Sequence, residues 1–169
     1  MQENTETPAP GSHIIAESAD FDPSLLTYEL EEENRPTDKQ NALEVTVLWG
    51  DTVVDSAIVH KDGPVPLGPR TDKSADLSVE GTLPADRFTI ATKTGTTSTI
   101  VLPADAKVGF RSAEGATSRD VPLSATDGPF AAKAYTLKLG ERLVYKYGTL
   151  TFVAEYVRGN AVLGARGMM

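Results

Sequence analysis

The chain has 169 residues, 14 of them glycine and 11 proline, no cysteine and a formal net charge of −8. This length allows one ordinary domain with a tail, and the lack of cysteine excludes disulfides, thiolate metal sites and cysteine nucleophiles. Residues 1–40 hold ten carboxylates against Arg35 and Lys39 and so account for the whole charge, and the neutral remainder is unsuited to nucleic acid, because affinity for phosphate comes mostly from Lys and Arg.

We expect residues 1–40 to form a disordered acidic arm, and residues 1–12 are too polar to bury enough apolar surface to fold. Within this arm, residues 22–33 read DPSLLTYELEEE and allow a short helix capped by Asp22, with leucines on one face. One interpretation of this tract is a solvated, mostly unstructured segment. The other is a short linear motif that folds on a partner or packs back on its own domain. The residues of this candidate partner-binding motif are Leu25, Leu26, Tyr28 and Leu30.

Beyond the arm, short runs of β-branched and aromatic residues alternate with turn signals. We expect strands at residues 43–49, 52–59, 65–68, 76–79, 87–92, 98–102, 107–111, 134–139, 142–147 and 150–157. Residues 112–131 are predicted to be a long loop with one short strand at 121–123. The spacing predicts an all-β domain over residues 41–158, a sandwich or open barrel of about ten short, mostly antiparallel strands. Residues 159–169 would form a C-terminal tail.

No constellation in the sequence supports catalysis or metal binding. A catalytic histidine needs a nucleophile and an orienting acid, and zinc needs three or four ligands. The chain has two histidines, His13 in the arm and His60 at the end of a predicted strand. Asp51 and Asp55 would point to the same side of a strand, as paired Ca²⁺ ligands do, but we favour a backbone-bonding role for Asp51 in a Gly-Asp turn. We therefore expect no enzyme activity, no cofactor and no metal.

Aromatic residues and glycines have structural interpretations. Four aromatic residues fall at alternating strand positions, which favours core packing over a base-stacking platform: Trp49, Phe88, Phe152 and Tyr156. The glycines stand singly between strands, so no phosphate-cradling loop of the Walker or dinucleotide type is present.

Two sequence blocks resemble a known family. Residues 43–54 read LEVTVLWGDTVV, residues 139–157 read LGERLVYKYGTLTFVAEYV, and residues 65–68 (VPLG) lie between them. They resemble the forkhead-associated (FHA)-like module of AgmX/PglI-type gliding-motility and TonB-like envelope proteins of myxobacterial type. The resemblance covers residues 43–158, about two thirds of the chain. It implies an FHA-like β-sandwich in the cytoplasmic part of a longer protein, with a membrane helix starting shortly after Met169.

FHA domains bind phosphothreonine through loops at one end of the sandwich. The Gly-Arg pair of that family would fall near Arg70, with a proline inserted. Its Ser-Arg-x-His block would fall near Arg87, where Ala85 or Asp86 replaces the serine and Phe88 replaces the histidine. A carboxylate beside a bound phosphate is repulsive. The resemblance thus implies a degenerate phosphate or anion site whose remaining residues are Arg70 and Arg87.

These observations favour a non-catalytic protein-interaction or scaffold module. It would dock other subunits of a trans-envelope motility or energy-transducing complex at the cytoplasmic side of the inner membrane. No apolar stretch approaches the roughly 20 residues of a membrane span and the first residues have no secretory signal, so we expect protein partners and no membrane insertion by this segment. Two alternatives stay open: a phosphothreonine-peptide-binding FHA domain, and an extracellular β-sandwich that binds carbohydrate or calcium.

Overall fold

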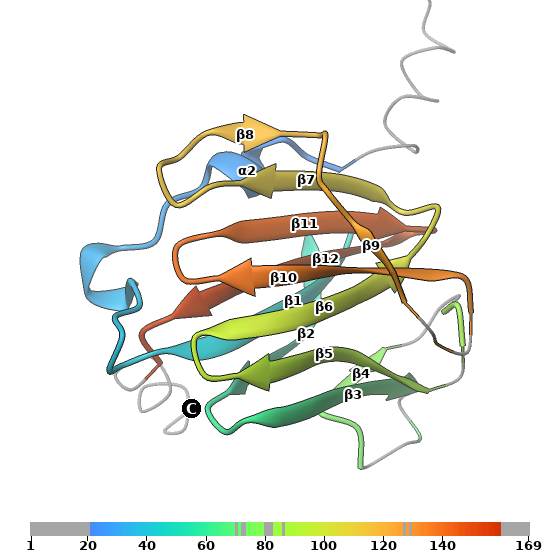
Figure 1. The fold of residues 1–169 in the computed structure, drawn as a ribbon. Coiled ribbons are helices and arrows are strands. Elements are labelled where there is room, and N and C mark those ends of the chain that lie inside the picture. Colours follow the sequence, from blue (N-terminus) through green and yellow to red (C-terminus); the bar gives the residue numbers. More distant parts are fainter. Residues whose placement is uncertain are drawn as a thin grey trace, which may run out of the picture.

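Two six-stranded sheets pack face to face in the computed structural model of the chain (Figure 1), which describes residues 21–69, 71, 74–79, 83–85, 87–126, 128 and 130–159. In spatial order, sheet A contains β2 (Thr52–Val59), β1 (Ala42–Trp49), β12 (Leu150–Val157), β11 (Arg142–Tyr147), β7 (Lys107–Arg111) and β8 (Thr117–Ser118). Sheet B contains β4 (Leu77–Val79), β3 (Gly63–Pro69), β5 (Phe88–Thr94), β6 (Thr97–Pro103), β10 (Ala132–Lys138) and β9 (Ser124–Thr126). This arrangement confirms the predicted all-β sandwich.

The strand ladders follow the local sequence pattern closely. All described strand pairs are antiparallel except β3 with β4, and four strands match their predicted bounds: β2, β7, β11 and β12. The β1–β2 hairpin closes at Gly50, whose φ of 64° lies in the left-handed region that glycine adopts without strain. The short strand predicted at 121–123 lies instead at β9, which pairs with β10. Pro122 lacks the backbone N–H that a ladder needs.

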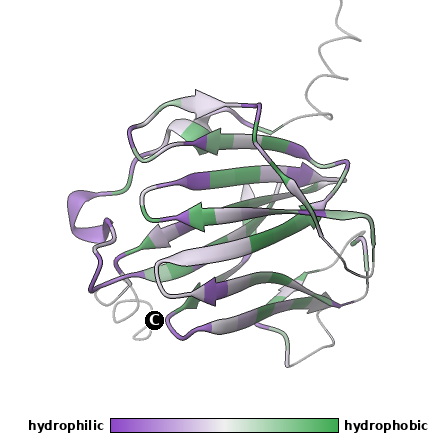
Figure 2. Ribbon diagram, viewed as in Figure 1, coloured by the Kyte–Doolittle hydropathy of each residue, from purple (hydrophilic) through white to green (hydrophobic). Residues whose placement is uncertain are grey.

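The core lies between the sheets and is built from hydrophobic residues of the long strands, along which Figure 2 shows the hydrophobic positions in green. The predicted core residues Phe88, Phe152 and Tyr156 are all buried, and Phe152 stacks on Tyr145 with ring centroids 4.9 Å apart. The prediction for Trp49 is wrong, because its side chain is 64% exposed. Trp49 is the last residue of β1, and the hairpin tip that follows it is itself exposed.

The structure describes part of the expected arm of residues 1–40, next to the domain that is predicted to begin at residue 41. Residues 1–20 of the expected arm lie outside the described residues, but residues 21–40 are placed, and Phe21 and Leu26 are buried against sheet A. The helix expected over 22–33 is replaced by two short pieces, α2 (Ser24–Thr27) and the 3-10 turn η2 (Glu32–Asn34). A helix of this length is marginal by itself, so contacts with the sheet decide its conformation.

Asp55 connects the edges of the two sheets. Its Oδ1 accepts a hydrogen bond from the backbone N–H of Ser56, and its Oδ2 accepts one from the N–H of Ser78 in β4, both at 2.8 Å. The backbone-bonding role that the sequence suggested for Asp51 thus belongs to Asp55. A charged side chain turned inward at a sheet edge also disfavours pairing of that edge with another chain.

Replacing Asp55 with Ala is expected to lower the free energy of unfolding by about 1–3 kcal/mol, because the N–H of Ser78 then loses its acceptor. Asp55→Asn keeps one acceptor oxygen and should cost less. Urea denaturation of the two variants measures the difference. Equal midpoints for Asp55→Ala and the unmodified protein would show that the bond between the sheets is not stabilising.

Candidate functional site

The outer face of sheet A, turned away from sheet B, carries two adjacent rows of side chains. The polar row runs across four neighbouring strands and consists of Glu44, Glu155, Arg142 and Arg111. The row beside it is apolar and consists of Val153, Val144 and Gly109. We call six of these residues the arm-binding face: Gly109, Arg111, Arg142, Val144, Val153 and Glu155. Residues 21–30, which lie against this face, are called the docked arm.

Phe21 and Leu26 anchor the docked arm on the apolar row. Both are buried, at 6% and 4% exposure, and they form a cluster with the fully buried Val144. Gly109 makes room for them: a Cβ there would lie 2.5 Å from Phe21 Cζ and 2.8 Å from Leu26 Cδ1, closer than atoms can pack. The guanidinium of Arg119 lies 4.3 Å from the centroid of the Phe21 ring, on which it makes a cation–π contact.

Two arginines of the polar row bind the main chain of the docked arm. Arg142 Nη1 donates a hydrogen bond of 2.8 Å to the carbonyl oxygen of Leu25, and Arg111 Nη1 donates one of 2.7 Å to that of Tyr28. Hydrogen bonds from a charged donor are stronger than those between neutral groups. The Tyr28 side chain is 59% exposed, with its ring centroid 5.2 Å from the Arg142 guanidinium. The face therefore recognises two apolar side chains and two main-chain carbonyls of the docked arm.

Arg142 is held in position by Glu155. Its Nε and Nη2 donate to the Glu155 carboxylate at 2.9–3.1 Å, and the two side chains are only 2% and 12% exposed. Burial raises the pKa of Glu155, and the positive charge of Arg142 opposes this rise. Burial, together with the charge of Arg142, lowers the pKa of Arg111. The negative charge of Glu155 thus offsets the positive charges of the neighbouring Arg142 and Arg111 beneath the arm.

Further bonds fix the chain beyond the docked arm. Arg35 Nε donates to the carbonyl of Leu30, and its guanidinium lies 3.6 Å from the Glu29 carboxylate. Arg158, directly after β12, donates from its backbone N–H to the carbonyl of Asn34 and from Nε to that of Arg35. These bonds keep the tether between the docked arm and β1 beside the end of β12.

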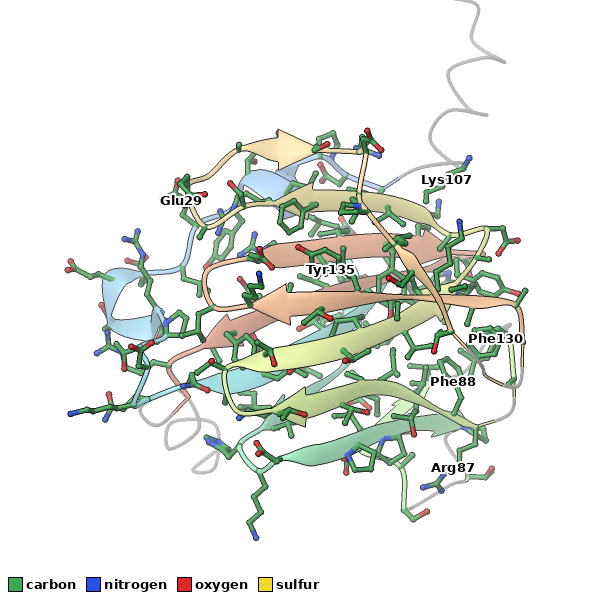
Figure 3. The ribbon with its side chains drawn as sticks, viewed as in Figure 1. Glu29, Arg87, Phe88, Lys107, Phe130 and Tyr135 are labelled. Atoms are coloured by element: carbon green, nitrogen blue, oxygen red, sulfur yellow. The ribbon has the colours of Figure 1, made fainter. Side chains whose placement is uncertain are left out.

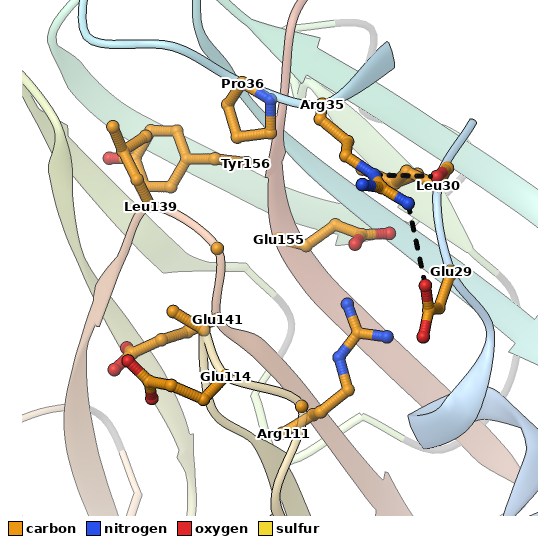
Figure 4. Close-up of a pocket in the computed structure, with 13 residues that line it drawn as sticks. Glu29, Leu30, Arg35, Pro36, Arg111, Glu114, Leu139, Glu141, Glu155 and Tyr156 are labelled. Carbon is orange, nitrogen blue, oxygen red and sulfur yellow. Dashed lines mark hydrogen bonds and ion pairs between the residues drawn. The ribbon is translucent and has the colours of Figure 1, made fainter. Parts of the chain in front are cut away.

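A cleft of about 450 Å³ opens between residues 29–36, where the docked arm continues into the tether, and two turns of the sandwich (Figure 4). Glu29, Leu30 and Arg35 line its arm side, and the turns after β7 and β10 contribute Glu114 and Glu141. Figure 4 shows the Arg111 guanidinium turned toward the carboxylates of Glu29 and Glu155. The Glu141 carboxylate accepts hydrogen bonds within the sandwich, from the Tyr135 hydroxyl and the Lys138 N–H. The cleft is therefore mixed in charge and belongs to the same face.

The predicted partner-binding residues divide between the two sides of the docked arm. Leu26 is buried in the interface, Leu25 and Leu30 are half-buried, and Tyr28 faces solvent. The sequence of residues 22–33 is open to two interpretations, a solvated unstructured segment or a motif that packs on a partner or on its own domain. The structure shows the docked arm packed on the chain's own domain.

Only one of the two arginines of the predicted anion site lies among the described residues. Arg70 lies outside the described residues, so their separation is not defined. Arg87 is exposed, donates a hydrogen bond to Ser74 Oγ, and lies on the opposite side of the molecule from Glu29 (Figure 3). His60 is also exposed, and His13 lies outside the described residues. Within the described ranges, no three His, Asp or Glu side chains are grouped as metal ligands.

Sequence reasoning missed the residues that build the arm-binding face. Gly109 interrupts the predicted strand 107–111, and an isolated strand glycine often marks a close approach of another segment. Arg142 and Glu155 lie on two predicted strands, and nothing in the local pattern distinguishes them from ordinary polar strand residues. Phe21 precedes the helical pattern of residues 22–33 by one residue, so that pattern does not include it.

Comparison with protein-family models, with curated proteins and with solved structures finds no match to this chain. The FHA-like resemblance, with its implied membership of an envelope motility machine, therefore stays a prediction. In the part of the chain that the structure describes, neither α2 nor η2 has the length and hydrophobicity of a membrane span.

Proposed function

We propose that the chain is a non-catalytic protein-interaction module that binds peptide segments on the outer face of sheet A. The observation that carries this proposal is that the face already holds a peptide, the docked arm, through two apolar anchors and two guanidinium–carbonyl bonds. Peptide-recognition domains work in this way: main-chain hydrogen bonds provide affinity, and pockets for particular side chains provide specificity.

The chemistry of the face favours reversible binding over a permanent core. A buried layer rarely contains a row of charged residues, since ions lose their hydration there. Here Glu155, Arg142 and Arg111 lie side by side under the arm. If the arm leaves, water reaches these groups and hydrates them, so the open face is compatible with solvent. This supports an exchangeable interface at this position.

The proposal extends to the place of such a module in the cell. We propose that it docks other subunits of a trans-envelope motility or energy-transducing complex, at the cytoplasmic side of the inner membrane. Support for this extension comes from the two sequence blocks, residues 43–54 and 139–157, and from the acidic arm attached to a formally neutral domain.

Peptide binding in trans tests the proposal. The full chain with Phe21→Ser and Leu26→Ser cannot anchor its own arm, because both anchors are lost, and should leave the face open. We expect saturable binding of a fluorescein-labelled peptide of residues 20–32 to this variant, measured by fluorescence anisotropy. Adding Gly109→Val, whose side chain fills the anchor site and suits a strand, should abolish that binding.

The matched control is Trp49→Ser in the open variant, since Trp49 is exposed and lies at the hairpin tip. This control should bind the peptide as the open variant does. Circular dichroism and thermal melts establish that each variant is folded. A folded open variant that does not bind the peptide, or binding that survives Gly109→Val, would contradict the proposed function.

A further inference from the structure

We infer that the docked arm is a latch that competes in cis with an external peptide of the same recognition pattern. That pattern is an aromatic residue, a turn-forming Asp-Pro, and a leucine at the end of the next helical turn, followed by extended chain. The inference rests on the proposed function and names the partner class and the control of the same face.

The pattern follows from how the arm is held. Pro23 and Asp22 start the turn, and Asp22 Oδ1 accepts a hydrogen bond of 3.0 Å from the N–H of Ser24. The single turn of α2 then brings Phe21 and Leu26 onto the same apolar row, beside Val144. The chain becomes extended at Tyr28, with ψ of 133°, where Arg111 binds the carbonyl. A ligand needs this turn as well as the two side chains.

The charges around the anchor site favour an acidic partner. The guanidinium of Arg119 lies on the ring of Phe21, directly before Asp22 in the arm. The guanidinium of Arg111 is turned toward the carboxylate of Glu29 at the other end of the docked arm, and this carboxylate opposes the lowering of the Arg111 pKa by burial (Figure 4). An arginine of the sandwich thus lies at each end of the bound segment, where the peptide carries the acidic residues Asp22 and Glu29. Arg111 Nε is buried without a hydrogen-bond partner among the described residues, which leaves one donor for a further acceptor of a ligand.

The arm can leave without opening the main core. Phe21 and Leu26 belong to a small cluster outside sheet A, separate from the large cluster between the two sheets. The carbonyls of Leu25 and Tyr28 can bond to water instead of arginine. Segments with few apolar anchors are the ones that open locally while the rest of a protein stays folded. Arm release is therefore a local event on the outside of the sandwich.

The tether makes the arm a strong competitor for its own site. Residues 31–41 join the docked arm to β1, and a short linker gives an effective concentration in the millimolar range. An external peptide gains access in proportion to the fraction of molecules whose arm is undocked. If the arm is docked in about nine of ten molecules, the apparent Kd rises about tenfold. A partner must therefore bind more tightly than the arm's own sequence.

The experiment compares the labelled peptide of residues 20–32 on the unmodified full chain and on the Phe21→Ser, Leu26→Ser full chain. We expect binding to the unmodified chain to be at least about tenfold weaker. Peptides carrying Phe21→Ser or Leu26→Ser should lose binding to the open variant. A peptide carrying Thr27→Ser is the matched control and should bind, since Thr27 is exposed. Hydrogen exchange of residues 21–30 in the unmodified chain should accelerate as the peptide is added.

The outcomes separate the latch from the proposed function. Equal affinity for both chains, or binding without faster exchange of residues 21–30, overturns the latch and leaves the peptide-binding function standing. Equal binding of all peptide variants overturns the recognition pattern. Absence of binding to the folded open variant overturns the proposed function itself, and the latch with it.

Discussion

Replacing Arg142 with Met is expected to lower the free energy of unfolding by about 3 kcal/mol at pH 7. The change leaves the Glu155 carboxylate buried without its cation, and breaking a buried ion pair in this way typically costs about 3–5 kcal/mol. We expect the lower end of this range because water can reach the Glu155 carboxylate in the variant. The variant also lacks the hydrogen bond from Arg142 to the Leu25 carbonyl, so the arm is released more easily and exposes that carboxylate. Guanidinium denaturation monitored by circular dichroism measures the loss.

The double variant Arg142→Met, Glu155→Gln is the control, since it removes both charges and should recover most of the stability. The pH dependence gives a second readout. The pKa of Glu155 is already raised by burial, and without Arg142 it rises further. The folded state then holds a proton that the unfolded state releases, so the stability of Arg142→Met should increase as the pH falls from about 7 to 5. A pH-independent loss, equal in the single and double variants, would mean that Arg142 acts only through packing.

Phe152 and Trp49 are expected to differ sharply when each is replaced by Ala. Phe152 is 3% exposed and stacks on the buried Tyr145, so Phe152→Ala should cost about 3–5 kcal/mol through the cavity that it leaves. Trp49 is 64% exposed, so Trp49→Ala should change stability by about 0.5 kcal/mol or less. Thermal and chemical denaturation of the two variants test this difference.

Phe152→Leu is the matched control for the core position. It keeps most of the apolar volume but loses the ring stacking, and should fall between Phe152→Ala and the unmodified protein. A large loss of stability in Trp49→Ala would show that Trp49 is covered in solution and that the hairpin tip is part of an interface. The comparison therefore tests the burial pattern on the neighbouring strands β1 and β12, where Trp49 pairs with Leu150 and Phe152 pairs with Val47.

The strands could be predicted because their signals are local. Alternating β-branched residues and single glycines define β2, β7, β11 and β12 to within their observed ends. Side-chain alternation also identified Phe88, Phe152 and Tyr156 as core residues. The same rule failed for Trp49, because alternation gives the direction of a side chain and not whether another element covers it. Whether a side chain near the end of a strand is covered depends on where the second sheet ends.

The arm-binding face could not be predicted, because its partners are distant in the sequence. Arg142 and Leu25 are 117 residues apart, and Arg111 and Tyr28 are 83 apart, so no local pattern relates them. The sequence by itself determined an all-β fold, the turns and an acidic arm that holds all of the net charge. Only the tertiary structure decided that β7, β11 and β12 lie side by side, which assembles the apolar and polar rows that hold the arm. The physical reason is that strand order is set by long-range hydrogen bonding and burial, which a period of two residues does not encode.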